Sequence, residues 1–402
     1  MHSFLIFYLL LCGLTFPSNL YAFDSSQKKW THKLGSEFQY FPLKGTQNQE
    51  QANFSIFLSS ELYWESDNND QSFTFLPYVR LDQQDPNRTH FDLREAHWDF
   101  VGDWWEVKTG ITRVFWGKTE FVHLVDIINQ RDGVEGLLEE EKLGQPMING
   151  SFILGNGVLD LYVLAGFRER TFAGEDGRLR LPLLVDAGAS LFDNTVIHGL
   201  DFAARWEQPL GDYVEAALSH FSGLSRNPTL LLDDPVTPTA LIPFYETIDQ
   251  TGLELGAIIN AWAYHLEAIT VSGQDKRWNS YTAGVEYTWG NVMSSGSDFT
   301  GIVEYIRDNR DQTAPTFLEK DLGFALRWAA NDIASTQSTF GLIIDPKTKE
   351  KITRLEFDRR LNEQWKIAIL IMVFESKQIP STEKSYYLKK DDFLQLQIIR
   401  FF

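Results

Sequence analysis

The sequence predicts an all-β protein, a single transmembrane antiparallel β-barrel of about 18 strands, with about 16 strands as the alternative. Three observations predict this fold. Segments of roughly ten residues, in which apolar and polar side chains alternate, recur along the whole chain. The connections between them alternate between short and long, and the final segment ends on an aromatic residue. No later segment is apolar over about 18 consecutive residues, so spanning helices are not expected.

The first 22 residues predict a cleaved secretory signal peptide, which leaves residues 23–402 for the barrel. An apolar core runs from Phe4 to Phe16, and Ala22 is a small residue at the expected cleavage site. The segment departs from the usual pattern because no Lys or Arg precedes its core. A lipoprotein cut before Cys12 is disfavoured because Leu11 is large. A retained helix is disfavoured because the apolar run is shorter than about 20 residues.

The composition argues against stabilisation by disulfides and against binding to nucleic acid. Cys12 is the only cysteine, so the mature chain cannot depend on disulfides. The net charge of −19 argues against a nucleic-acid partner, which requires clustered Lys and Arg.

The strands are predicted from the period-2 pattern. In 51–65, for example, Phe54, Ile56 and Leu58 alternate with Asn53 and Ser55. The predicted strands are 31–41 (the weakest), 51–65, 72–81, 91–101, 104–113, 146–155, 158–167, 196–207, 213–221, 251–259, 262–272, 281–289, 299–307, 322–330, 336–344, 352–361, 365–374 and 392–402.

The connections provide an independent test, because outer-membrane barrels have short periplasmic turns and longer outer loops. The predicted short turns are 102–103, 156–157, 208–212, 260–261, 331–335 and 362–364, and 290–298 fits less well. The predicted long loops are 115–145, 168–195, 222–250, 308–321 and 375–391. A soluble β-sandwich, the alternative, has no physical reason to alternate in this way.

The last strand, FLQLQIIRFF, places Leu394, Leu396, Ile398 and Phe402 on one face. Phe402 resembles the terminal aromatic signal that barrel assembly machinery recognises. Tryptophans near the predicted strand ends are typical of aromatic girdles at the two membrane interfaces.

Five stretches resemble a family of porin-like outer-membrane proteins of Gram-negative bacteria. They are FWGKTEFVHLVDIINQRD, EEEKLGQPM, FRERTFAGEDGRLRLPLLVD, IDQTG and LRWAAND. The similarity extends over nearly the whole mature chain, and the first and third stretches are the most specific. The resemblance implies a single-chain barrel in the outer membrane, and the family has no established substrate.

If the apolar faces meet lipid, the opposite faces line the lumen. This parity predicts the pore-lining residues Glu267, Glu286, Glu304, Arg327, Arg354, Glu356 and His265. Two interpretations stay open. The charges form a wall that favours cations or orients polar solutes, or they form a structural ladder in which Arg327 pairs with Glu304. Both interpretations expect water to contact the carboxylates.

The connection 115–145 is too charged for a buried helix and too apolar for a solvated loop. We therefore expect it to fold into the barrel and constrict the lumen, with an outer lid as the alternative. Its apolar members would anchor it on the wall: Phe115, Trp116, Phe121, Leu124, Ile127 and Ile128. Its polar members would face water: Lys118, Glu120, His123, Asp126, Arg131 and Asp132. The spacing of residues 124, 127 and 128 predicts a short helical turn.

An outer-loop charge cluster of Arg168, Arg170, Arg178 and Arg180 is interleaved with acidic residues. It would bind an anionic solute at the outer mouth, or it would neutralise itself within the loop; the second is favoured. The segment GEDGRLR lacks the ligand spacing of a calcium loop, so no metal or other cofactor is expected.

The sequence favours a channel over an enzyme. It contains no HExxH or GxSxG motif, and its histidines are isolated. We expect a porin-like channel for passive diffusion of a small hydrophilic solute. The alternative is a loop-plugged structural, receptor or export-assembly barrel without open-pore activity. The expected partners are outer-membrane lipid and lipopolysaccharide, the barrel assembly machinery and, as an open alternative, a homo-oligomer.

Overall fold

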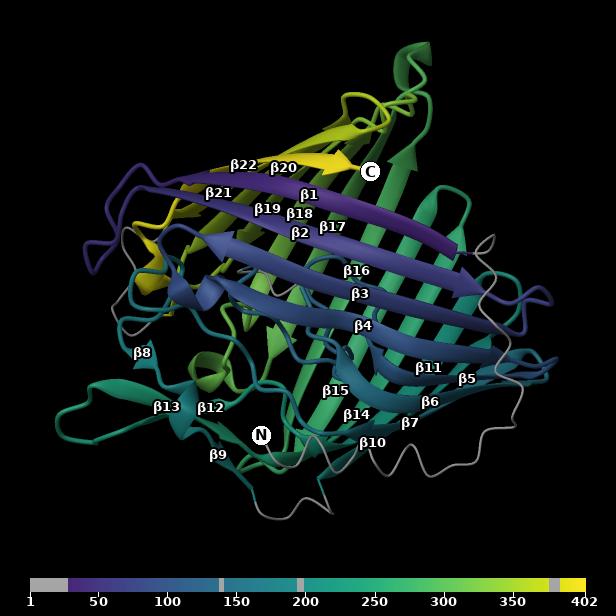
Figure 1. Ribbon diagram of the computed structural model, residues 1–402, viewed down its shortest axis with the longest axis horizontal. Helices are drawn as coiled ribbons and strands as arrows, with labels where there is room; N and C mark the ends of the chain where they lie inside the picture. Colours follow the sequence, from purple (N-terminus) through teal and green to yellow (C-terminus); the bar gives the residue numbers. More distant parts are fainter. Residues whose placement is uncertain (1–27, 137–140, 194–198, 376–383) are drawn as a thin grey trace.

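The computed structural model describes residues 28–136, 141–193, 199–375 and 384–402. The predicted signal peptide, 1–22, lies outside the described residues. Eighteen strands form one closed antiparallel sheet (Figure 1). They are β1 (Lys28–Tyr40), β2 (Ala52–Glu65), β3 (Gln71–Asp82), β4 (His90–Val101), β5 (Trp105–Thr112), β6 (Gln145–Leu154), β7 (Gly157–Ala165), β10 (Leu200–Pro209), β11 (Val214–Leu224), β14 (Thr247–Ile259), β15 (Trp262–Ser272), β16 (Trp278–Trp289), β17 (Asp298–Asp308), β18 (Lys320–Ala329), β19 (Gln337–Ile344), β20 (Lys351–Arg360), β21 (Trp365–Glu375) and β22 (Phe393–Phe401).

The barrel closes where β1 pairs with β22, in a register that matches Gln39 with Gln395. Every barrel strand therefore has a partner on each side, and lipid meets no unpaired strand edge. The predicted count of 18 strands is confirmed, and the alternative of 16 is wrong. Each predicted strand overlaps one strand of the barrel. In the described part of the chain, no helix is long and apolar enough to span a membrane.

The outward faces are apolar, as the parity argument predicts. Leu34 and Phe38 of β1 and Phe324 and Leu326 of β18 are exposed, whereas Glu37 and Gln39, the polar neighbours of Phe38, point inward. This pattern is the one expected of strands with one face in lipid. Both ends of the described barrel lie on the short-turn side, where the Phe402 N–H donates to the His32 carbonyl at 3.0 Å.

The long connections lie at the opposite end, which we call the outer end. Two of the connections there, 273–277 and 345–350, are short. Four short strands lie outside the barrel at this end: β8 (Leu184–Val185), β9 (Leu191–Phe192), β12 (Thr229–Leu232) and β13 (Ala240–Tyr245) (Figure 1). They form a small sheet around β13. The described short helices are η2 (Pro86–Arg88), η3 (Ala187–Ala189), η4 (Val292–Ser294), η5 (Asp311–Thr313) and η6 (Lys384–Leu388).

Candidate functional site

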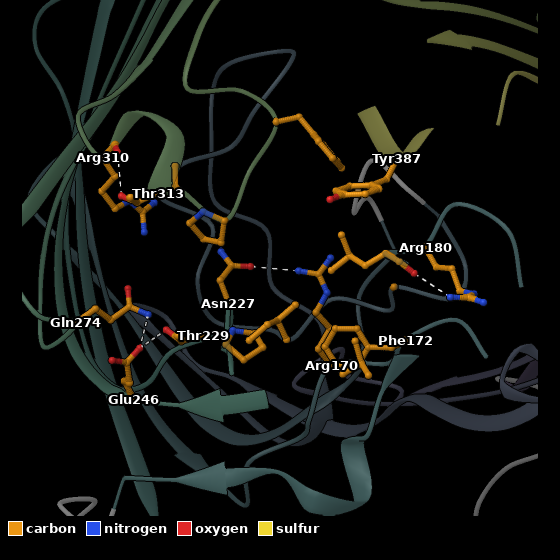
Figure 2. A pocket seen from close by; sticks show the side chains of 18 of the residues that line it. Arg170, Phe172, Arg180, Asn227, Thr229, Glu246, Gln274, Arg310, Thr313 and Tyr387 are labelled. Carbon is orange, nitrogen blue, oxygen red and sulfur yellow. Dashed lines mark hydrogen bonds between the residues drawn. The ribbon is translucent and has the colours of Figure 1, made fainter. Parts of the chain in front are cut away.

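A cavity of about 980 Å³ opens between the outer loops (Figure 2). Its lining carries five basic side chains and two acidic ones. They are Arg170, Arg180, Lys276, Arg277 and Arg310, with Glu246 and Asp275. Arg170 Nη1 donates to Asn227 Oδ1 at 3.3 Å, and Arg310 packs on the Trp278 ring at 3.3 Å from the ring centroid. The outer end of the barrel is therefore hollow and polar, and aromatic rings hold some of its cationic groups.

The predicted outer-loop charge cluster is not one site. Arg170 and Arg180 line the outer cavity. Arg168 instead pairs with Asp92 of the barrel wall at 2.6 Å. Arg178 pairs with Asp391 at 2.7 Å, and its guanidinium lies 3.9 Å from the centroid of the Phe41 ring. The favoured expectation that this cluster neutralises itself within the loop is wrong for Arg168 and Arg178, because their carboxylate partners lie outside the loop.

Residues 113–136 and 141–144 lie between β5 and β6 and cross the lumen, and we call them the crossing loop. It leaves the wall after β5 and contacts β15, β17 and β18 before it returns to β6. In the ring of 18 strands, β18 is the ninth strand after β5, so the loop reaches the opposite wall. Asn129 holds the ends of this excursion together. Its Oδ1 accepts from the Val114 N–H at 2.7 Å, and its Nδ2 donates to the Thr112 and Leu143 carbonyls at 2.9 Å.

Glu267 of β15 is the first anchor of the crossing loop on the far wall. Its Oε1 accepts from the Lys118 N–H at 2.7 Å, the Thr119 N–H at 3.1 Å and the Thr119 hydroxyl at 2.7 Å. Its Oε2 accepts from the Val125 N–H at 3.3 Å. The side chain is 0% exposed. The loop therefore replaces water as the solvation shell of this carboxylate, which satisfies the rule that a buried charge must be hydrogen-bonded.

Glu304 of β17 is the second anchor. Its carboxylate accepts from the Glu120 N–H at 2.6 Å and from the Phe121 N–H at 3.1 Å, and the residue is 1% exposed. Arg327 pairs with the Glu120 side chain at 2.5 Å. The predicted pair between Arg327 and Glu304 is therefore wrong. The expectation that water contacts the carboxylates of Glu267 and Glu304 is also wrong, because the crossing loop covers both.

Glycines of the wall make room for the crossing loop. A Cβ atom at Gly323 would lie 2.6 Å from the Phe121 ring, and one at Gly252 would lie 2.9 Å from Val125. Both glycines sit at inward-facing positions of their strands. The loop thus packs directly on the backbone of the far wall. Glycine at an inward position of a strand is the signal that could have identified this contact from the sequence.

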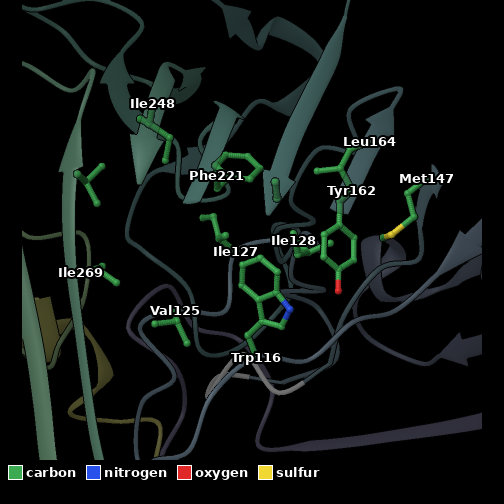
Figure 3. Close-up of a cluster of buried hydrophobic side chains, with 12 residues drawn as sticks. Trp116, Val125, Ile127, Ile128, Met147, Tyr162, Leu164, Phe221, Ile248 and Ile269 are labelled. Carbon is green, nitrogen blue, oxygen red and sulfur yellow. The ribbon is translucent and has the colours of Figure 1, made fainter. Parts of the chain in front are cut away.

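A hydrophobic cluster lies in the lumen beside the strands β6, β7, β10, β11, β14 and β15 (Figure 3). The crossing loop contributes Trp116, Val125, Ile127 and Ile128, and the wall contributes Met147, Tyr162, Leu164, Ala203, Phe221, Ile248, Ile269 and Val271. Trp116 packs edge-on against Tyr162, with ring centroids 5.6 Å apart. These wall residues come from the consecutive strands β6 to β15, so this side is closed by packed apolar side chains.

Several predicted orientations within the crossing loop are corrected. Trp116, Ile127 and Ile128 are buried as expected of anchors, whereas Phe115 is 57% exposed. Asp126 and Asp132, predicted to face water, have buried side chains. Residues 124–128 form no helix. The apolar anchors bury the backbone next to them, so neighbouring acids can remain charged only where a cation meets them.

Lys142 supplies that cation for Asp126. The two side chains form an ion pair, and the Lys142 ammonium also donates to the Val114 carbonyl at 2.7 Å. Burial lowers the pKa of Lys142, and the Asp126 carboxylate opposes that effect. Burial likewise lowers the pKa of His123, whose ring packs edge-on against Phe115 at 4.7 Å between centroids. Arg131 lies where the loop bridges to Lys142.

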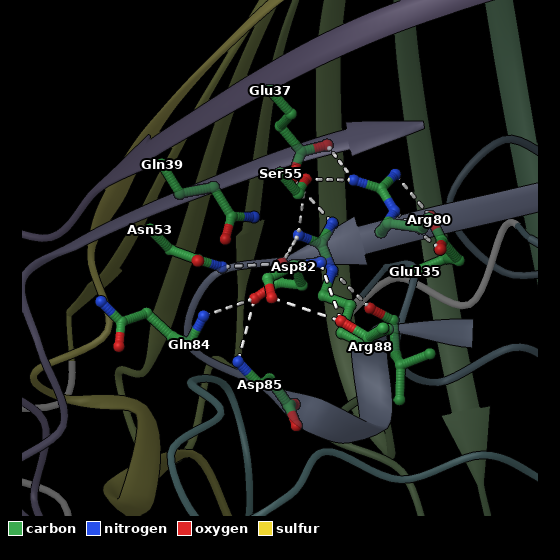
Figure 4. Close-up of polar contacts among 12 residues, drawn as sticks. Glu37, Gln39, Asn53, Ser55, Arg80, Asp82, Gln84, Asp85, Arg88 and Glu135 are labelled. Carbon is green, nitrogen blue, oxygen red and sulfur yellow. Dashed lines mark hydrogen bonds and ion pairs between the residues drawn. The ribbon is translucent and has the colours of Figure 1, made fainter. Parts of the chain in front are cut away.

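The returning half of the crossing loop is held by arginines of the near wall (Figure 4). Arg80 pairs with Glu135 at 2.6 Å, and Arg94 pairs with Asp132 at 2.7 Å. Arg88 donates to the Val134 carbonyl at 2.9 Å and pairs with Glu37 of β1 at 2.7 Å. The far-wall contacts and the returning half of the crossing loop are therefore both fixed by buried charge-assisted hydrogen bonds.

The same region holds a group of possible metal ligands. Among the described residues, the ligand atoms of His90, Asp132 and Glu135 lie within 4.8 Å of one another. The two carboxylates already pair with Arg94 and Arg80, so we assign the group to the ion-pair network and not to a metal site.

A second cavity, of about 460 Å³, lies on the open side of the crossing loop. It runs between the returning half of the loop and strands β20, β21, β22, β1 and β2. Gly133, Gly136, Ala173 and Leu179 line both cavities, so the two adjoin. The outer cavity therefore continues into the inner one, which lies beside the strands β20, β21, β22, β1 and β2.

The remaining predicted pore residues have different positions. Arg354 and Glu356 form an ion pair and line this inner cavity. His265 Nε2 and Glu286 Oε1 lie 3.1 Å apart on the neighbouring strands β15 and β16. Lys118 of the crossing loop pairs with Glu215 at 2.9 Å. Sequence reasoning missed the inner cavity's amide side chains, among them Gln39, Asn53 and Gln395, because uncharged polar residues are ordinary on a lumen face.

Comparisons with known proteins support the fold. No family model matches the sequence, and no curated protein matches it. OccK5 (OpdH) of Pseudomonas aeruginosa is similar in structure, with a TM-score of 0.53 at 9% identity over 94% of this chain and 98% of that one. A BenF-like porin from Pseudomonas fluorescens gives 0.51 at 10% identity, over 94% and 97%. Wzi, from Escherichia coli, gives 0.55 at 7% identity, over 94% and 85%. The chain therefore has the fold of porin-like outer-membrane β-barrels.

Proposed function

We propose that the protein is a porin-like channel in the outer membrane of a Gram-negative bacterium, for passive diffusion of a small hydrophilic solute. The observation that carries the proposal is the pair of adjoining polar cavities beside the crossing loop. The solved porins that share the fold, OccK5 and the BenF-like porin, support it. No step of this function requires an enzymatic reaction or a cofactor.

The mechanism is geometric and electrostatic. A solute first enters the outer cavity, where basic side chains and aromatic rings line its path. The crossing loop and the apolar cluster then confine it to the side formed by β20, β21, β22, β1 and β2. Selectivity comes from the width of that remaining passage and from the hydrogen-bonding groups that line it.

The first test is single-channel recording. The mature protein, folded in detergent and reconstituted in a planar bilayer, is expected to give steady steps of low conductance, because the crossing loop closes part of the lumen. A protein that migrates as a folded barrel in a heat-modifiability assay and yet passes no current would contradict the proposal.

A second candidate function is a loop-plugged barrel that acts as a receptor or in export assembly. Arg178 favours it, because this side chain ties the loop after β7 to Asp391 and to the Lys390 and Leu43 carbonyls on the far side of the outer end. Wzi, described as a carbohydrate-binding barrel involved in capsule assembly, has the same fold. The silent folded barrel of the preceding test would select this candidate.

We also propose that Phe402 guides insertion by the barrel assembly machinery into lipid and lipopolysaccharide. Its side chain is exposed beside the closing strand β1, where its backbone is bonded to His32. Deletion of Phe402 is expected to reduce the membrane-inserted protein about tenfold or more, whereas Phe402→Tyr, which keeps the ring, stays near wild type. Membrane fractions analysed by heat-modifiable mobility measure this, and equal insertion of both variants would refute the role.

A further inference from the structure

The inner cavity carries a row of carboxamides across the seam where the barrel closes. Gln395 of β22, Gln39 of β1 and Asn53 of β2 are direct cross-strand neighbours. Gln39 Nε2 donates to Gln395 Oε1 at 2.8 Å, and Asn53 Nδ2 donates to Asp82 at 3.0 Å (Figure 4 shows Gln39 and Asn53). All three line the cavity. A carboxamide offers a donor and an acceptor on one planar group, which matches the hydroxyl groups of a polyol.

The cationic groups in the described lining of the cavity are already paired with carboxylates. Lys366 pairs with Asp358 at 2.6 Å, and Arg354 pairs with Glu356. Arg178 pairs with Asp391. The remaining cation of the lining, Arg88, pairs with Glu37 and Asp82 at 2.7 and 2.9 Å. An anionic solute would therefore lose its hydration without gaining an uncommitted cation, and that exchange is unfavourable.

The acidic side chains of the lining are compensated less completely. Glu135 binds Arg80 and Asp85 accepts from backbone N–H groups, whereas Glu50 and Glu141 each lie 3.9 Å from a cation. Leu370, the cross-strand neighbour of Gln395, adds apolar surface together with Leu179 and Met372. A volume of about 460 Å³ is in the range of sites that enclose one small organic molecule. The lining thus combines amides and apolar patches with cations that are already paired.

We infer that the inner cavity binds an uncharged, polyhydroxylated solute of about disaccharide size, held by the amide row of Gln395, Gln39 and Asn53. The inference rests on the proposed function, because it names the class of solute that the channel would pass. The hydroxyl groups exchange hydrogen bonds with the carboxamides, and the C–H faces of the solute pack on the apolar patches. A carboxylate on the same solute would add a desolvation cost that no wall group offsets.

The test is equilibrium dialysis on the full mature protein, folded in a detergent without a sugar headgroup. The probes are radiolabelled lactose and lactobionate, which have a common galactose unit and differ at the other end, where lactobionate carries a carboxylate. Saturable lactose binding is expected, at least about tenfold tighter than that of lactobionate. The absence of saturable lactose binding, or equal or tighter binding of lactobionate, would overturn the inference.

Variants locate the site. Gln39→Met with Gln395→Met is expected to weaken lactose binding by about tenfold or more, which corresponds to about 1.4 kcal/mol. Gln208→Met is the matched control, because Gln208 lies at the short-turn end, away from the cavity, and binds Asn156. If the double variant fails to fold, the comparison of lactose and lactobionate binding to the wild type still tests the inference. Binding without conductance would reject the channel alone, and conductance without binding would reject this inference alone.

Discussion

Replacement of residues 115–128 by a Gly-Ser-Gly linker is expected to raise the single-channel conductance about twofold or more. The excised segment contributes Trp116, Val125, Ile127 and Ile128 to the apolar cluster in the lumen. It also contains the backbone groups that cover Glu267 and Glu304. Without the segment, water would fill the space that it occupies, and the conductance of a hydrated pore rises with its open cross-section.

The geometry favours this deletion, because the Val114 N–H and the Asn129 side chain are already in hydrogen-bond contact. A short linker therefore joins the two ends without moving the wall. The control replaces residues 234–239, the exposed tip between β12 and β13, by Asn-Gly, a two-residue turn that suits a hairpin. That change should leave the conductance unchanged. Equal conductance of the deletion variant and the wild type would place the crossing loop outside the path.

Glu267→Ala is expected to release the crossing loop while the barrel stays intact. Three backbone N–H groups and the Thr119 hydroxyl would lose their acceptor, at a cost of about 3–5 kcal/mol to the docked loop. The recordings should then show frequent current fluctuations. Trypsin, which cuts after Lys and Arg, should cleave at Lys118 much faster than in the wild type.

Glu286→Ala is the matched control for this variant. Glu286 is on the neighbouring strand, and its ion pair is with His265 of the wall and not with the loop. This variant should retain quiet currents and trypsin resistance at Lys118. A shift of the reversal potential in Glu267→Ala without added noise would show that Glu267 is a charge of the ion path and not an anchor. That outcome would reject the assignment.

The strands could be predicted because lipid imposes the pattern directly. A residue such as Phe324 or Leu326 must be apolar if its face meets hydrocarbon, whatever the rest of the barrel does. The same local rule placed Glu267 and Glu304 on the inward face. It could not state what covers them, because their partners lie 148 and 184 positions away in the sequence.

The apolar cluster in the lumen could not be predicted from the sequence either. Tyr162 and Leu164 point inward, while Leu161 and Val163 of the same strand face lipid. A strand that is apolar on both faces shows no alternation of apolar and polar residues. Its sequence therefore does not indicate whether its inward face meets water or packs against protein. The crossing loop's mixed composition indicated an inward position, but it did not indicate which acids would be buried.

The sequence by itself thus determined the all-β class, the 18 strands and the inward parity of the charged residues, because each depends only on neighbours along one strand. The tertiary structure alone decided that Glu267 and Glu304 hold the crossing loop, that Arg327 pairs with Glu120, and that the outer arginines separate. These contacts join opposite walls of a closed barrel. The tilt of the strands and the path of the loops determine which residues make these contacts. Neither can be deduced from the spacing of residues along the chain.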